Sequence, residues 1–209
     1  MSQNSHTTAR RRNAVESFAT AAQALGDVGA GMAVFALNRG QWSMIDAMLY
    51  VLDAVGAADI SVWTWSIADY EVQVLSRLAI DRRIGKGLLV VDHSARNKSA
   101  ASIHGWKARF GPDSVRYVVN HSKMARIEAK GGLRFVLRGS MNLNCNARFE
   151  QFDITEGGLE HDLVKRVESE LPVLPDDWSG ASVYAASKVS AAFDAQGLEV
   201  FNGVKQWTK

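Results

Sequence analysis

A histidine and a lysine two positions apart, His121 and Lys123, stand just after the apolar run SVRYVV. If this run is a strand, side chains at positions i and i+2 point to the same side, and the imidazole and the ammonium lie together. An ammonium can hold a phosphate oxyanion while a neighbouring imidazole attacks phosphorus or moves a proton. The pair therefore indicates chemistry at a phosphate, at the sheet end where open α/β folds place their ligands.

A second polar group follows further along the chain. Gly139-Ser140-Met141-Asn142 comes after another β-like run, and Glu150 opens the next one. Such a turn can aim a hydroxyl, a carboxamide and backbone N–H groups at the same anion. Glu150 can hold the second ring nitrogen of His121 and so fix its tautomer. We expect one catalytic site with these members: His121, Lys123, Ser140, Asn142 and Glu150.

In type and order these residues resemble the HKD motif of the phospholipase D superfamily: His-x-Lys, an acid, Gly-Ser-x-Asn and a downstream glutamate. The likeness extends over residues 31–171. It implies a metal-independent phosphodiesterase without a cofactor, in which His121 forms a phosphohistidine intermediate. Lys123 and Asn142 would hold the non-bridging oxygens, while Ser140 and Glu150 orient the site. Gly139 would support the turn.

The sequence departs from the family pattern at the acid. Glu128 stands where the family has aspartate, and the stretch from Glu128 to Gly139 is longer than usual. The family assigns this acid a supporting role. The residues themselves favour a structural ion pair between Glu128 and a nearby arginine or lysine, and both interpretations stay open.

The number of motif copies predicts an assembly. Of the five histidines, only His121 has a lysine two positions later. Superfamily members with one copy in a short chain resemble the homodimeric nucleases, in which two protomers build one site. The resemblance therefore implies an endonuclease-like homodimer that acts on nucleic acid, with DNA ranked before RNA.

Strand-like and helix-like runs alternate between residues 31 and 119, which is typical of a sheet with right-handed crossovers. Then β-like runs at 125–129 and 133–137 flank Lys130-Gly131-Gly132 and predict a hairpin. A strand in FEQFDIT and a helix in GLEHDLVKRVESEL follow. We expect an α/β fold, a phospholipase D-like mixed, mostly parallel sheet with helices on both faces. A helix is also predicted from Asn13 to Leu25.

Three parts are expected along the chain: a basic tail with the N-terminal helix at 1–29, the phospholipase D-like domain at 30–171, and a C-terminal extension at 172–209. The net charge of +2 is small, so nucleic-acid binding must depend on a local patch. The candidates for that patch are Arg10, Arg11, Arg12, His93, Arg96, Lys98 and Trp65.

Other roles compete for some of these candidates. Asp92 and Ser94 beside His93 can serve to start a helix, and Trp65 can fill the core instead of stacking on a base. The single cysteine, Cys145, excludes an internal disulfide or a multi-cysteine zinc site and is expected to be a bystander. No metal-ligand cluster is visible in the sequence.

The beginning of the sequence carries no signal-peptide pattern, and its apolar windows are too short to span a bilayer. We expect a cytoplasmic protein without a membrane partner. Two alternatives to the nuclease remain. One is a non-catalytic nucleic-acid-binding protein on the same fold. The other, ranked lower, is a phospholipid-directed phosphodiesterase, for which no amphipathic basic helix is apparent.

Overall fold

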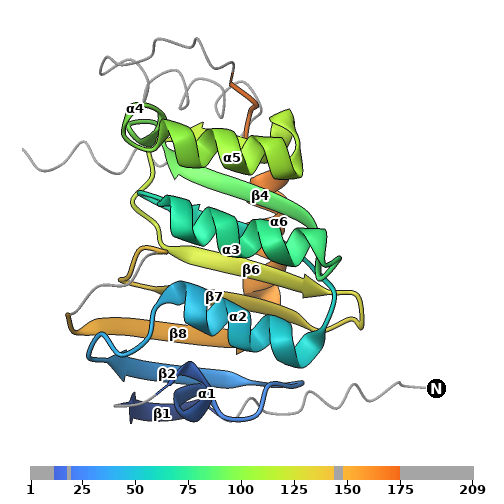
Figure 1. Cartoon of the computed structure of the whole chain (residues 1–209). Helices are drawn as coiled ribbons and strands as arrows, with labels where there is room; N and C mark the ends of the chain where they lie inside the picture. Colours follow the sequence, from blue (N-terminus) through green and yellow to red (C-terminus); the bar gives the residue numbers. More distant parts are fainter. Residues whose placement is uncertain (1–11, 18–19, 144–147, 175–209) are drawn as a thin grey trace, which may run out of the picture.

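The computed structural model describes residues 12–17, 20–143 and 148–174, which form an eight-stranded sheet with helices on both faces (Figure 1). The strand order across the sheet is β1-β2-β8-β7-β6-β3-β4-β5. The strands are β1 Arg12–Ser17, β2 Ala33–Asn38, β3 Ala58–Thr64, β4 Ile84–Asp92, β5 Val115–Val118, β6 Met124–Ala129, β7 Arg134–Gly139 and β8 Glu150–Glu156. The helices are α1 Ala21–Leu25, α2 Met44–Val55, α3 Asp69–Ile80, α4 Ala95–Lys98, α5 Ala100–Phe110 and α6 Leu159–Glu170, with a 3-10 turn at Pro112–Ser114.

The predicted α/β architecture is confirmed, with one correction to the strand directions. β1 with β2, β3 with β4, and β4 with β5 pair in parallel, as crossover helices require. The pairs β2–β8, β8–β7, β7–β6 and β6–β3 are antiparallel. The sheet is therefore mixed and not mostly parallel. The reason is that β8, β7 and β6 insert between β2 and β3: β8 runs against β2, β6 runs against β3, and β7 runs against both β8 and β6.

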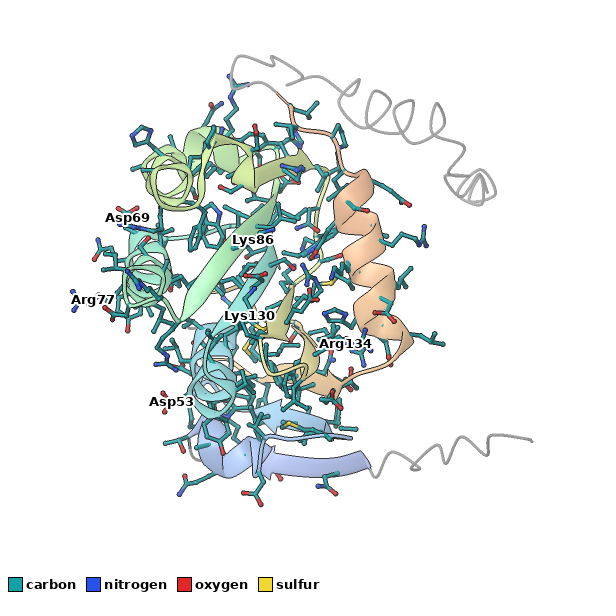
Figure 2. All side chains as sticks on the ribbon, turned by 90° about the vertical axis from the view of Figure 1, so that its right-hand side faces the viewer. Asp53, Asp69, Arg77, Lys86, Lys130 and Arg134 are labelled. Carbon is teal, nitrogen blue, oxygen red and sulfur yellow. The ribbon has the colours of Figure 1, made fainter. Side chains whose placement is uncertain are left out.

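The helices divide unequally between the two faces. α1, α2, α3 and α5 lie on one face and α6 on the other, as the turned view in Figure 2 shows. The main apolar core fills the space under the first group, and its fully buried members include Met48, Leu75, Leu89, Trp106 and Phe135. A smaller cluster of Val90, Val118 and Leu171 lies on the α6 face. Residues of one strand thus serve two cores, because successive side chains point to opposite faces.

Helix α2 shows how local sequence sets the element boundaries. The Ser43 hydroxyl accepts a hydrogen bond from the Asp46 N–H, and the Asp46 carboxylate accepts one from the Ser43 N–H, which makes a capping box. The helix ends at Gly56, whose φ of 75° is a conformation that glycine adopts without strain.

The predicted helix from Asn13 to Leu25 is wrong in its first half. Residues Arg12–Ser17 form strand β1, paired in parallel with β2, and only Ala21–Leu25 are helical. Thr20 caps this short helix together with Gln23. The outer edge of β2 supplies backbone partners to β1, and helical periodicity in a sequence carries no information about such a distant edge.

The remaining elements follow the predictions closely. The hairpin joins β6 to β7 as expected, and the helical segment after β4 is divided at Ser99 into α4 and α5. The C-terminal extension at 172–209 lies outside the described residues from position 175 onward. None of the helices in the described ranges is both long enough and apolar enough to cross a bilayer.

Candidate functional site

The strand ends that hold the predicted site lie at one edge of the sheet, on the left in Figure 1. The parallel strands β3, β4 and β5 finish there, and so does β7, whereas the antiparallel β6 and β8 begin there. Register places Met124 opposite both Trp63 and Arg138, so the residues before β6 lie beside the ends of β3 and β7. The edge therefore gathers the segments that hold the predicted site.

His121 and Lys123 are in direct contact at this edge. The Lys123 ammonium lies 3.1 Å from His121 Nδ1 and donates a second hydrogen bond of 2.7 Å to the His121 carbonyl. An ammonium has only protons to offer, so Nδ1 accepts here and, in the neutral imidazole, Nε2 carries the proton. The His121 side chain is exposed. Nucleophilic attack by Nε2 requires the other tautomer, which becomes accessible once the ammonium moves from Nδ1 to a phosphate oxygen.

Two opposing effects set the pKa of Lys123. Partial burial lowers the pKa of Lys123 below its ordinary value, while the negative charge of Glu150 raises it and leaves a net decrease. A less strongly solvated ammonium loses less hydration when it binds a phosphate oxygen. Glu150 thus acts electrostatically on Lys123. The predicted hydrogen bond from Glu150 to the second ring nitrogen of His121 stays a prediction.

The turn after β7 is joined to the start of β8. The Ser140 hydroxyl donates to the buried Glu150 carboxylate and accepts from the Gln151 N–H at 2.9 Å. At Gly139, a Cβ atom would come within 2.5 Å of the Gln151 carbonyl oxygen, so only glycine allows the two strands to approach this closely. Gly139 and Ser140 therefore fix the position of Glu150 relative to the turn.

Asn142 lies on the same turn and is half-buried. Its Oδ1 atom is buried and has no hydrogen-bond partner within the described part of the chain. The oxygen can only accept a hydrogen bond, so the group of Asn142 able to bind a phosphate oxygen is the amide Nδ2. Cys145, predicted to be a bystander, lies outside the described residues.

Two buried residues that the sequence analysis did not assign to the site hold the His121 loop in place. Asp92, at the end of β4, accepts the Asn120 N–H at 3.1 Å. The Asn120 amide in turn donates to the Thr64 carbonyl at 3.1 Å, and its Oδ1 accepts the Ser122 N–H at 2.8 Å. The Asn-His-Ser order is a recognisable turn signal, but the partners on β3 and β4 are far away in sequence.

Asp92 also has the local role that its position suggested. Its Oδ1 accepts the Ser94 N–H at 2.9 Å, and His93 Nδ1 lies 3.7 Å from the same oxygen. Burial raises the pKa of Asp92, but the hydrogen bonds from Ser94 and Asn120 and the neighbouring His93 outweigh it, and the pKa lies below its ordinary value. The carboxylate is therefore kept ionised where it supports the loop.

The nucleic-acid candidates are placed unevenly. The Trp65 and His121 ring centroids are 6.4 Å apart, and the Lys98 ammonium lies 5.2 Å from the centre of the Trp65 ring. Arg96 is half-buried on α4, two positions before Lys98. Arg10 and Arg11 lie outside the described residues, and Arg12 begins strand β1. Trp65 is exposed and does not fill the core.

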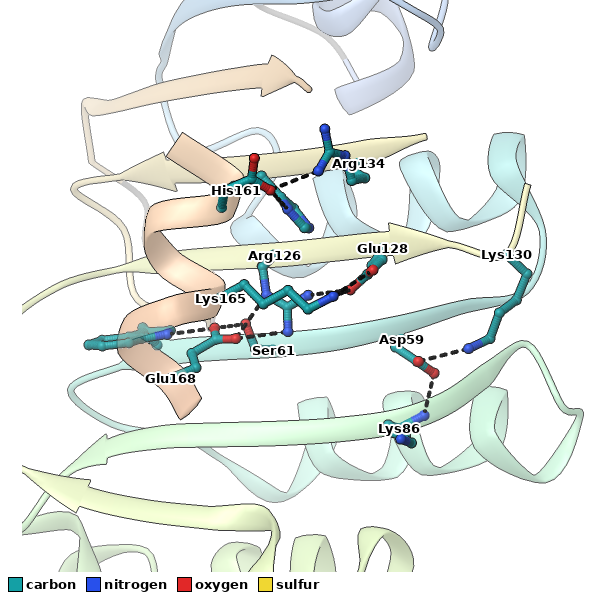
Figure 3. Close-up of polar contacts among 12 residues, drawn as sticks. Asp59, Ser61, Lys86, Arg126, Glu128, Lys130, Arg134, His161, Lys165 and Glu168 are labelled. Atoms are coloured by element: carbon teal, nitrogen blue, oxygen red, sulfur yellow. Dashed lines mark hydrogen bonds and ion pairs between the residues drawn. The ribbon is translucent and has the colours of Figure 1, made fainter. Parts of the chain in front are cut away.

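Glu128 lies at the opposite end of β6 from Lys123, about 17 Å away along an extended strand. It accepts hydrogen bonds from Lys165 on α6 and from Arg126 (Figure 3). The hydrogen bond from Lys165 and the charges of both partners keep the pKa of Glu128 below its ordinary value in spite of burial. These contacts match the structural ion pair that the residues favoured and do not join Glu128 to His121.

A metal site is not apparent from the side chains in the described ranges, where no three His, Cys, Asp or Glu residues are grouped closely enough to hold an ion. No protein-family model matches the chain, and no curated protein matches it.

Solved structures do match. The chain is similar to polyphosphate kinase from Porphyromonas gingivalis, with 15% identity and a TM-score of 0.51 over 68% of this chain and 26% of that protein. It is also similar to phosphatidylserine synthase from Haemophilus influenzae, with 12% identity and a TM-score of 0.50 over 77% of this chain and 43% of that protein. For Nuc, a phospholipase D family member from Salmonella typhimurium, the identity is 18% and the TM-score 0.44, over 66% of this chain and 92% of that one.

The chain spans about a quarter of the kinase and less than half of the synthase. Both belong to the superfamily whose motif the residues around His121 resemble. At these identities the likeness concerns the fold, in which the mixed sheet carries His121, Lys123, Ser140 and Glu150 at a single edge. This chain has the fold of the phospholipase D superfamily.

Proposed function

We propose that this chain is a metal-independent phosphodiesterase that cleaves nucleic acid at a site shared by two protomers. The observation that carries the proposal is the exposed His121 imidazole with the Lys123 ammonium at 3.1 Å, at the edge where the Ser140–Glu150 pair also lies. A nucleophile and an oxyanion holder side by side are what transfer of a phosphoryl group requires.

In the reaction, Nε2 of one His121 attacks phosphorus and forms a P–N bond while the P–O bond to the leaving strand breaks. A second imidazole on the opposite side of the phosphorus gives its proton to the leaving oxygen. The same imidazole then takes a proton from water, whose oxygen attacks phosphorus and releases the first histidine. Lys123 and the Asn142 amide stabilise the charge on the non-bridging oxygens.

This scheme needs two imidazoles at one phosphorus, and the chain has one His-x-Lys. A two-fold axis near His121 would supply the second from a partner, in the commonest oligomer symmetry. Wild-type chains mixed and re-equilibrated with an equal amount of His121→Ala chains should then keep about one half of their activity per wild-type chain, because random pairing places half of them in mixed dimers.

His93 provides the control for the dimer. It directly follows β4 at the same end of the sheet, and its N–H donates to the Val118 carbonyl at 2.9 Å, three residues before His121. The dimer scheme expects His93→Ala to keep its activity and the mixing experiment to show inhibition. If His93→Ala is inactive and mixing has no effect beyond dilution, both imidazoles come from one chain, and the shared site is wrong.

Metal independence is tested by incubating the protein with plasmid DNA, single-stranded DNA and RNA in excess EDTA. We expect cleavage of nucleic acid to continue, since no step uses a metal. Binding without cleavage, with and without added magnesium, would contradict the proposal and favour a protein that only binds nucleic acid. Activity lost in EDTA and restored by magnesium would indicate a different mechanism.

A further inference from the structure

Two aromatic side chains are exposed at the edge that carries His121. Trp65, just after β3, is 41% exposed, and Phe149, just before β8, is 67% exposed. Their exposure contrasts with Trp42 and Trp106, which are 3% and 0% exposed and belong to the core. The core does not use these two rings, and an exposed aromatic ring next to a cation is a candidate for stacking on a base.

A cation accompanies each exposed ring. Lys98 lies 5.2 Å from the Trp65 ring centre, and Arg39 lies 5.0 Å from the Phe149 ring centre. Exposed aromatic rings with neighbouring cations are how proteins bind unpaired nucleic acid, because the rings stack on bases while the cations contact phosphates.

The order of strands places the two rings on either side of the site. From β8 through β7 and β6 to β3, the edge presents Phe149, then Ser140, then His121, and then Trp65. Trp65 is 6.4 Å from the His121 ring, a separation that one sugar can bridge between a phosphate at His121 and its base. Phe149 precedes β8, two strands from β6 and about 10 Å away on the other side.

We propose that Trp65 and Phe149 are stacking sites for unpaired nucleobases on the two sides of the phosphate at His121. The preferred substrate is then single-stranded or locally unpaired nucleic acid. This inference rests on the proposed function, because it takes His121 as the phosphate site. In a duplex both faces of each base are covered by its neighbours, and a ring at the strand edge cannot stack on them without breaking pairs. Lys98 contacts the phosphate next to the base on Trp65, whereas the Arg39 guanidinium is paired with Glu16 at 2.6 Å.

The test measures binding by fluorescence anisotropy in the His121→Asn background, which keeps the ligand from being cut. The ligands are single-stranded oligothymidylate, an abasic strand of the same length and charge, and a duplex. We expect oligothymidylate to bind about tenfold or more tightly than the abasic strand. Trp65→Ala should remove most of this preference without weakening abasic binding, and Trp65→Phe should retain it.

Two variants separate stacking from charge and from general disturbance. Lys98→Ala should weaken the binding of both single strands and reduce the salt dependence of binding by about one phosphate contact. Leu159→Ala removes an 85% exposed apolar side chain at the start of α6, near the opposite end of the strands. This variant should bind both single strands with the affinity of the His121→Asn background.

The inference is overturned if Trp65→Ala weakens the binding of oligothymidylate and of the abasic strand equally, or if it weakens the binding of neither. It is also overturned if the variant dissociates the dimer in light scattering while the base preference persists, since Trp65 is then a subunit contact. Failure of the proposed function looks different: oligothymidylate is bound with the expected preference, but the wild-type protein leaves it uncut.

Discussion

Strand β6 connects two polar regions that differ in their exposure to solvent. Before its first residue, Lys123 and the exposed His121 contact each other in a region open to solvent. Further along the same strand, Arg126 and Glu128 face α6 in a cluster enclosed between helix and sheet (Figure 3). Residues of one sequence motif thus belong to two regions. His121 and Lys123 lie in the candidate reaction site, and Glu128 lies in a structural cluster.

In the α6-face cluster, formed by Arg126, Glu168, Ser61 and Trp63, the polar groups bond to one another. The Arg126 guanidinium lies 2.8 Å from Glu168, and both side chains are less than a tenth exposed. The second oxygen of Glu168 accepts hydrogen bonds from Ser61 and from the Trp63 indole. A buried charge is tolerated only with partners of this kind. This cluster attaches α6 to the sheet.

The site edge has the opposite character. His121 is exposed, and partial burial lowers the pKa of the neighbouring Lys123. Groups that a fold leaves incompletely satisfied are available to a ligand. The comparison therefore predicts that changes at the edge affect activity, whereas changes in the cluster affect stability.

The largest effect is expected at His121. His121→Ala removes both the nucleophile and the proton donor, so phosphodiesterase activity should fall to background. The side chain is exposed, and the free energy of unfolding should stay within about 0.5 kcal/mol of wild type. Turnover of a simple phosphodiester and thermal unfolding are the two measurements. An active variant would remove His121 from the mechanism.

A smaller loss is expected from the oxyanion-binding side chains. Lys123→Ala and Asn142→Ala should each reduce kcat by about a hundredfold, the typical effect of one lost oxyanion donor. Steady-state kinetics checks this. Should either variant raise only KM and leave kcat unchanged, its side chain binds the ground state and not the transition state.

Glu168 tests the cluster. Glu168→Ala leaves Arg126 buried without its main partner and should lower the free energy of unfolding by about 3 kcal/mol. Activity per folded molecule should persist. Glu170→Ala, which breaks a more exposed pair with Arg166 on the same helix, should cost less than about 1 kcal/mol. Urea unfolding with a parallel activity assay distinguishes them. If Glu168→Ala lost activity per folded molecule as well as stability, the functional difference between the two regions would be contradicted.

The smallest expected effect is a shift in pH dependence. Burial lowers the pKa of Lys123 and the charge of Glu150 opposes this, so Glu150→Gln should lower that pKa further. The ammonium would then deprotonate at lower pH, and the alkaline side of the pH profile of kcat/KM should move to lower pH. Glu170→Gln serves as the control and should leave it in place. A shift to higher pH in Glu150→Gln would contradict the electrostatic role.

Much of the fold could be predicted from the sequence, because residues close together in the chain determine many of its helix ends and turns. The capping box at Ser43, the stop at Gly56 and the hairpin at Lys130-Gly131-Gly132 are formed by neighbours in the chain. The gathering of His121, Lys123, Ser140 and Glu150 could also be predicted, since strand ends bring such residues to one edge.

The parts that could not be predicted depend on distant partners. Strand β1 exists because the edge of β2 is available, and the mixed sheet exists because β8 lies between β2 and β7. The Asp92–Asn120 hydrogen bond spans 28 positions and sets the His121 loop. Neither periodicity nor motif spacing contains these pairings.

The central claim, that His121 attacks phosphorus, is tested most directly by trapping the intermediate. Wild-type protein is incubated with a 5′-labelled oligonucleotide in EDTA, denatured at alkaline pH where a phosphohistidine survives, digested and examined by mass spectrometry. The account predicts a nucleotide adduct on the peptide that contains His121, absent from His121→Ala and present in Glu168→Ala. Cleavage without any adduct, or an adduct on another residue such as His93, would contradict it.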